Sequence, residues 1–191
     1  MITAALLLAA AASCGVERSD VKRMSDEKAG RVDLRPAETS VDHLASLPAP
    51  DPPVVGWEAR GAPGREEFRV YQVAAIISCA KIEDDRDVHV CACEPAAWDA
   101  RSRRCRGPSL VAELVDPACA RGSRTLNEII RARARLVAVA GGDLTEGTLR
   151  ALVGRRVTLE GVAFYDRLHG QTGAPKNGVE LHPLLRVIFA Q

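Results

Sequence analysis

Alternating apolar and polar residues mark a series of strands in the second part of the chain. Five segments are apolar, rich in β-branched residues and bounded by charged turns, glycine or proline: 69–79, 88–93, 109–115, 156–165 and 179–189. Such segments are typical of β-strands. The first is long, like the bent first strand of a small barrel, and a charged turn centred on Asp85 joins it to the second. The pattern therefore predicts a mainly β fold.

A helix is predicted between the third and fourth strands. Thr125 and Glu128 form a capping-box pair, and apolar residues recur at helical spacing until Gly141 and Gly142. Another short helix is predicted within 144–154. Three strands, a helix and two strands are the element order of the OB fold, a five-stranded barrel. The sequence thus predicts a small five-stranded OB-like barrel with an N-terminal arm.

The same pattern divides the chain into four parts. They are a signal peptide (1–13), a tether or arm (14–47), a proline-rich connector (48–66) and the barrel domain (67–191). The apolar run from Ile2 to Ala12 has the length of a signal-peptide core and is too short to cross a bilayer. This segment predicts export from a bacterial cytoplasm.

Cys14 is the predicted site of lipidation. It ends the segment Ala11-Ala12-Ser13-Cys14, which resembles a bacterial lipobox, and a polar stretch follows it. We therefore expect a lipoprotein of the bacterial cell envelope, periplasmic or on the surface, whose lipid anchor binds it to a membrane. No Lys or Arg precedes the apolar run, so an ordinary cleaved signal peptide is the alternative.

Cysteine usage agrees with export. Five cysteines remain if Cys14 carries a lipid, and an oxidising compartment would pair some of them. A hairpin centred on Asp85 brings one pair face to face, and a second pair brackets the next loop. The predicted disulfides are Cys79–Cys91 and Cys93–Cys105, with Cys119 as the odd thiol. A zinc site on Cys91, Cys93 and Cys105 is the alternative, although its ligand spacing differs from the common zinc patterns.

The C-terminal part of the barrel carries the most specific motif. His169-Gly170-Gln171-Thr172-Gly173, followed by Asn177-Gly178-Val179-Glu180-Leu181-His182-Pro183, resembles a family of uncharacterised bacterial exported proteins. The resemblance extends from about Val21 to Phe189 and includes Phe164-Tyr165-Asp166. It implies a shared fold rather than a function.

A fainter similarity is to phosphodiesterases of the staphylococcal nuclease type, which also have an OB barrel. Asp85-Arg86-Asp87 and Val115-Asp116-Pro117 lie in the places of that family's acidic segments. Its chemistry needs calcium-binding carboxylates, a general-base glutamate and arginines on the phosphate. Cys119 occupies the glutamate position and Val111 an arginine position, so the chain departs from that mechanism at both places.

Polar residues on the predicted strands form the candidate site. Its centre consists of His89, Glu113, Glu180 and His182. In an OB barrel the third strand neighbours both the second and the fifth, so these side chains converge if their faces agree. Two imidazoles and two carboxylates could bind a divalent metal or exchange protons. Further candidates for the same rim are Asp87, Asp116, Asp166 and His169. A structural network that braces the barrel is the alternative.

Composition narrows the function classes only slightly. The chain is 47% hydrophobic and 27% charged, as in globular proteins, and its formal net charge of +1 argues against nucleic acid as the main partner. The basic run of Arg101, Arg103, Arg104 and Arg106 is either a solvated loop or a site for an anionic polymer or lipid headgroup.

No complete catalytic set is visible, so we expect a noncatalytic OB-like module for binding or envelope interaction. The alternatives are a metal-dependent hydrolase resembling a phosphodiesterase and a purely structural envelope protein.

Overall fold

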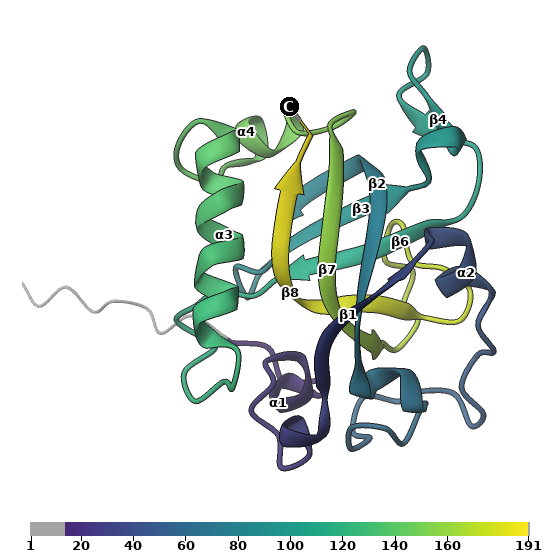
Figure 1. Ribbon diagram of the computed structural model, residues 1–191, viewed down its shortest axis with the longest axis vertical. Helices are drawn as coiled ribbons and strands as arrows, with labels where there is room; N and C mark the ends of the chain where they lie inside the picture. The colour runs from purple at the N-terminus through teal and green to yellow at the C-terminus, as the bar shows by residue number, and fades with distance from the viewer. Residues whose placement is uncertain (1–13, 191) are drawn as a thin grey trace, which may run out of the picture.

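The computed structural model describes residues 14–190 and contains a closed five-stranded barrel (Figure 1). The barrel strands are β2 (Arg69–Ile82), β3 (Val88–Cys93), β6 (Ser109–Leu114), β7 (Arg156–Tyr165) and β8 (Val179–Phe189). Their order is β2-β3-β6-β8-β7, and β7 pairs with β2 to close the barrel. β6 and β8 are parallel, whereas the other neighbouring barrel strands are antiparallel. The predicted OB-like barrel is confirmed.

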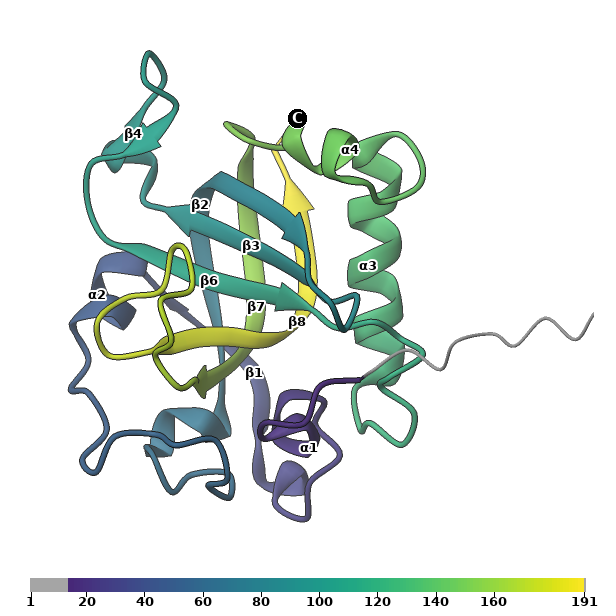
Figure 2. The ribbon, with the colours of Figure 1, turned by 180° about the vertical axis from the view of Figure 1, so that it is seen from behind.

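Two helices lie between β6 and β7 in the chain. α3 (Leu126–Ala140) runs alongside β8, and α4 (Glu146–Arg150) lies beyond the C-terminal end of α3 (Figures 1 and 2). α3 ends at Gly141, whose φ of 84° is the left-handed conformation that glycine adopts readily. The capping box predicted at Thr125 is wrong, because its hydroxyl lies 3.3 Å from Ser123 Oγ and caps no helical N–H. Instead, Thr145 and Thr148 form a capping box at α4.

The residues before β2 form an arm that packs on the barrel. Its elements are α1 (Ser19–Lys22), the 3-10 helix η1 (Ala29–Arg31), β1 (Asp33–Thr39) and α2 (Val41–Ser46), followed by the 3-10 helix η2 (Arg65–Phe68). β1 adds to the sheet as a parallel neighbour of β2. The arm buries Val21, Met24, Val32, Val41 and Leu44. The predicted signal peptide, 1–13, lies outside the described residues.

A small projecting hairpin follows β3. It consists of the 3-10 helix η3 (Pro95–Ala97), β4 (Trp98–Asp99) and β5 (Arg104–Cys105). Figures 1 and 2 show it at the same end of the barrel as α4 and the C-terminus. Within residues 14–190, no helix is long and apolar enough to cross a membrane.

Both predicted disulfides are present. Cys79–Cys91 links β2 to β3, across a turn that is centred on Asp85 as expected. Cys93–Cys105 closes the projecting hairpin. The alternative zinc site on these cysteines is therefore wrong, since bonded sulfurs offer no thiolate.

A third disulfide joins Cys14 to Cys119 and ties the start of the arm to the loop before α3. The expectation that Cys119 is an odd thiol is therefore wrong. A lipid thioether would use the same Cys14 sulfur, so this disulfide and the predicted lipidation exclude each other, and the bond argues against lipid on Cys14. Three disulfides indicate an oxidising compartment, which is usually outside the cytoplasm.

Candidate functional site

Three neighbouring strands bring the predicted polar residues together on the outer face of the barrel, because the alternate residues of each strand face the core. His89 on β3 lies directly opposite Glu113 on β6. β8 runs beside β6, with Glu180 paired to Val111, and so presents Glu180 and His182 to the same region. All four side chains are buried. The convergence that strand alternation predicts is therefore observed, at a buried site on the outer face of the barrel.

Glu113 lies between the two histidines. Its Oε1 is 2.9 Å from His89 Nδ1, and its Oε2 is 3.0 Å from His182 Nδ1. The other ring nitrogen of His89 is 2.9 Å from the Thr172 carbonyl. A carbonyl and a carboxylate can only accept, so both ring nitrogens of His89 donate and the ring is protonated. Glu113 thus stabilises a buried imidazolium.

His182 and Glu180 are less well satisfied. His182 Nε2 lies 3.6 Å from Asp87 Oδ2, which is too long for a hydrogen bond, and neither ring nitrogen has a partner in hydrogen-bonding geometry. The Glu180 Oε2 atom also lacks a hydrogen-bond partner. Buried polar atoms are nearly always hydrogen-bonded, so these atoms are available to a ligand or a water molecule.

Burial and neighbouring charges set the protonation states. Burial alone would lower the pKa of His89, but Glu113 raises it above the usual value. Burial opposes the charge of His182 as well, yet Glu113 and Asp87 raise its pKa to about 10. Burial acts to raise the pKa of Glu113, whereas the two histidines hold it well below its usual range. For Glu180, burial and the charges of Glu113 and Asp166 together raise the pKa well above the ordinary value.

The arm contributes a cation that the sequence did not predict. Lys22 Nζ lies 3.5 Å from Asp166 Oδ1 and 5.3 Å from the centre of the Phe164 ring, which packs edge-on against His182. Although burial opposes its charge, Asp166 and Glu113 raise the pKa of Lys22. Lys22 lies next to Val21, where the family resemblance begins, but nothing in the local pattern of the arm indicates that it reaches the outer face of the barrel.

The remaining candidates lie at different distances from this centre. Asp87 contacts the cluster through His182, and its other oxygen accepts from the backbone N–H of Asp116 at 2.6 Å. Asp166 joins it through Lys22. The Asp116 carboxylate pairs instead with Arg86 at 2.7 Å. His169 is exposed on the loop before β8 and makes no recorded contact with the cluster.

A cavity of about 230 Å³ lies beside the cluster. Lys22, Asp85 and Asp87 line it, together with the two cysteines of the Cys14–Cys119 disulfide. The Asp85 carboxyl is half-buried, and burial together with the charge of Asp87 raises its pKa. The arm therefore packs against the cluster, and a polar cavity lies beside Asp87.

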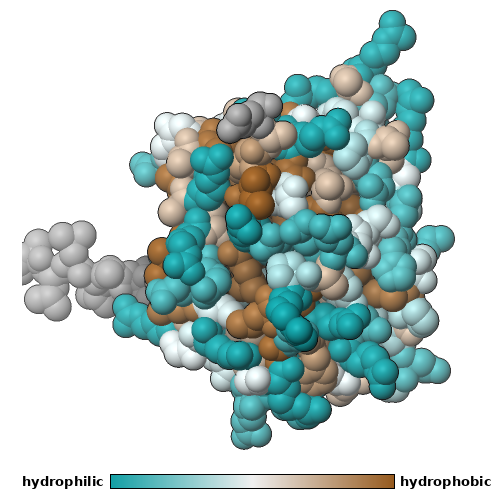
Figure 3. Space-filling view, viewed as in Figure 1, coloured by the Kyte–Doolittle hydropathy of each residue, from teal (hydrophilic) through white to brown (hydrophobic). Residues whose placement is uncertain are grey.

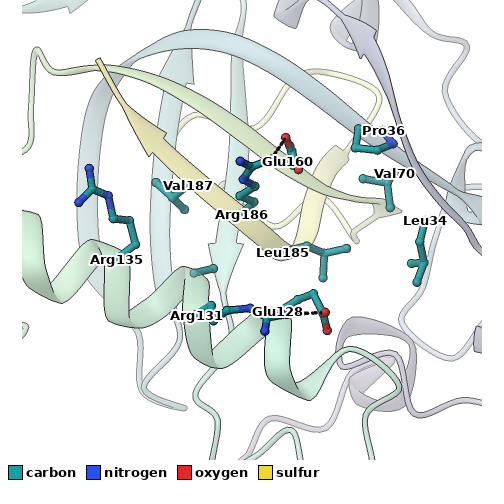
Figure 4. A pocket seen from close by; sticks show the side chains of 11 residues that line it. Leu34, Pro36, Val70, Glu128, Arg131, Arg135, Glu160, Leu185, Arg186 and Val187 are labelled. Carbon is teal, nitrogen blue, oxygen red and sulfur yellow. Dashed lines mark hydrogen bonds and ion pairs between the residues drawn. The ribbon is translucent and has the colours of Figure 1, made fainter. Parts of the chain in front are cut away.

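A larger groove, of about 470 Å³, lies on another face between α3, β8 and β1. Figure 3 shows apolar surface along the middle of this face, and Figure 4 shows Leu34 and Leu185 in the groove with Arg186 paired to Glu160. No member of the His89–Glu113–His182 cluster lines it. The groove is thus separate from the candidate site.

The positions expected from the nuclease similarity do not provide its chemistry. Val111 is fully buried in the barrel wall, and Cys119 is bonded to Cys14. Neither an arginine nor a glutamate stands at these places. No known family model, curated protein or solved structure matches the chain, so the fold alone is established and both family resemblances stay predictions.

Proposed function

We propose that the barrel is a divalent-cation-binding module of an exported protein, with the ion bound by Asp87, Glu113 and His182. The observation that carries this proposal is the convergence of one ligand atom from each residue, all within 4.8 Å of one another, together with the missing hydrogen bonds of His182. Asp87 directly precedes β3, Glu113 lies on β6 and His182 on β8, so the barrel itself fixes the three ligands.

The chemistry of these donors suits such an ion. One imidazole and two carboxylates are ligands for Zn²⁺ and Mn²⁺. Ligand atoms around tetrahedral zinc lie about 3.4 Å apart at metal–ligand distances near 2.1 Å. A set within 4.8 Å therefore needs a contraction of at most about 1.4 Å between ligand atoms, which side-chain rotation can supply. His89 would act indirectly, since its bond to Glu113 orients that ligand.

The cavity beside Asp87 favours metal-dependent hydrolysis as a second candidate. It would allow a small substrate to approach the ion next to Lys22. Against this candidate, the general-base and arginine positions of the nuclease pattern are occupied by Cys119 and Val111. We therefore put ion binding first and treat hydrolysis as a further step that needs its own demonstration.

The test pairs calorimetric titration with Zn²⁺ or Mn²⁺ and thermal unfolding, both on oxidised, chelator-treated protein. We expect one ion per chain. Loss of supporting residues alone costs about 10–100-fold in metal affinity, so His182→Gln or Asp87→Asn should cost more. His43→Gln is the matched control, because His43 is an exposed histidine on α2; this variant should bind the ion as the parent protein does.

Absence of binding in the parent would refute the proposal. If His182→Gln then also lowers the melting temperature, the cluster serves to brace the barrel. If the parent binds the ion, hydrolysis is tested separately with a phosphodiester substrate, with and without chelator.

A further inference from the structure

One end of the barrel is unusually rich in exposed arginines. Four lie on the projecting hairpin around β4 and β5, and three lie on α4 or at the start of β7. They are Arg101, Arg103, Arg104, Arg106, Arg150, Arg155 and Arg156. Figures 1 and 2 show that the hairpin and α4 occupy the same end of the molecule. We refer to these seven residues as the arginine end.

Two contacts fix the hairpin on this end. The Cys93–Cys105 disulfide closes its base. Arg103 Nη2 donates to the Val153 carbonyl at 3.1 Å, which ties the hairpin to the loop that leads into β7. The hairpin arginines therefore cannot swing freely away from Arg155 and Arg156.

Almost none of this charge is neutralised within the protein. Among the ion pairs of residues 14–190, only Arg106 of the seven has a carboxylate partner, Asp99, at 2.5 Å. The whole chain carries a formal net charge of only +1, so the remainder of the molecule is acidic. The arginine end therefore carries an excess of positive charge that attracts anions.

We propose that the arginine end docks on a membrane surface through the phosphate groups of anionic phospholipids. Guanidinium groups form bidentate hydrogen bonds with phosphate, and all seven cations are arginines rather than lysines. The hairpin projects from the barrel, as an element that meets an extended surface does. The two cavities described above are both lined by other residues.

Nucleic acid is the less favoured polyanion. Single-stranded binding sites combine a basic groove with exposed aromatic rings on which bases stack. At the arginine end, Trp98 is the aromatic residue on the hairpin, and it is only half-exposed against Gly154. This surface offers cations without a stacking platform.

The test is sedimentation of the oxidised protein with vesicles of phosphatidylcholine, with or without phosphatidylglycerol. The parent should bind only the phosphatidylglycerol vesicles, and less at high salt. Each arginine near an anionic bilayer contributes about 1 kcal/mol, so the triple variant Arg101→Gln, Arg104→Gln, Arg156→Gln should bind roughly 100-fold more weakly.

The matched control removes three exposed arginines elsewhere: Arg121→Gln, Arg131→Gln, Arg135→Gln. Both triple variants lose the same net charge, so a docking surface predicts near-parental binding for the control alone. Equal loss in both would show an unspecific charge effect and overturn the proposal. Failure of the parent to bind phosphatidylglycerol vesicles, or tighter binding to a single-stranded oligonucleotide than to the vesicles, would overturn it as well.

Discussion

The buried ion pair between Arg18, next to α1, and Glu67, on η2, allows a quantitative prediction. The two terminal nitrogens of the Arg18 guanidinium each donate to the Glu67 carboxylate at 2.8 Å, and the two side chains are 1% and 0% exposed. Arg18 also donates to the Tyr165 and Glu58 carbonyls and stacks on Phe164, 4.5 Å from the ring centre. It is therefore the main polar link of the arm.

Arg18→Met removes these donors and leaves the Glu67 charge in the interior. Glu67 keeps two backbone donors, the N–H groups of Gly61 and Tyr165. Removal of one partner from a buried pair costs about 3–5 kcal/mol. This is a large part of the stability of a domain, which is typically about 5–15 kcal/mol. The double variant Arg18→Met, Glu67→Gln should cost less than the sum of the two single changes, because no unpaired charge remains.

Urea unfolding under nonreducing conditions measures the effect. Arg35→Met on the same arm is the control, since Arg35 pairs with Asp33 at the surface and its loss should leave the midpoint unchanged. A cost below about 1 kcal/mol for Arg18→Met would refute the reasoning, because a buried pair cannot be broken so cheaply.

Three further predictions concern the cluster and the third disulfide. In chelator-treated protein, the stability that His182 contributes is complete below its unfolded pKa of 6.5 and is lost as the pH rises through its folded pKa of about 10. The free energy of unfolding should therefore fall between neutral pH and a pH of about 9.5. The His182→Gln variant should show a smaller fall. The pKa of Glu180 is raised in the folded protein, so the free-energy cost of burying this carboxyl grows as the pH rises above 4.5. Glu180→Gln should therefore raise the melting temperature more at a pH of about 8 than at a pH of about 4. An equal change at both pH values would contradict this prediction. Nonreducing peptide mapping of exported protein should recover Cys14 bonded to Cys119, whereas incorporation of a labelled fatty acid that depends on Cys14 would support the lipid anchor instead.

The sequence could predict the barrel because its strands carry a period of two and its helix a period of 3.6. The neighbours of each strand then follow from the OB order, which is why His89, Glu113, Glu180 and His182 could be grouped without coordinates. The sequence pattern did not predict β1, because its first four residues, Asp33 to Pro36, are all exposed and show no alternation of buried and exposed side chains. It is a strand only because β2 offers a partner.

The arm explains most of what sequence reasoning could not supply. Lys22 and Arg18 reach the barrel through long-range contacts, with Asp166 and the Tyr165 carbonyl, that no local pattern encodes. The pairing of Cys14 with Cys119 spans 105 residues and is likewise a long-range contact that no local pattern predicts. A lipobox-like segment explained Cys14 equally well from sequence alone, so only a three-dimensional arrangement could favour the disulfide.

The connectivity of the disulfides has a consequence for how the protein must be made. Cys14 is the first of the six cysteines, and the pair that it forms with Cys119 encloses the two short-range pairs. If an exported chain were oxidised in the order in which its thiols emerge, Cys14 would bond to Cys79, and no native pair would form. Reshuffling of such bonds takes from seconds to hours, depending on oxidant and isomerase. We therefore expect correct maturation to depend on a thiol–disulfide isomerase, and expression in a compartment with an oxidase alone to yield scrambled isomers.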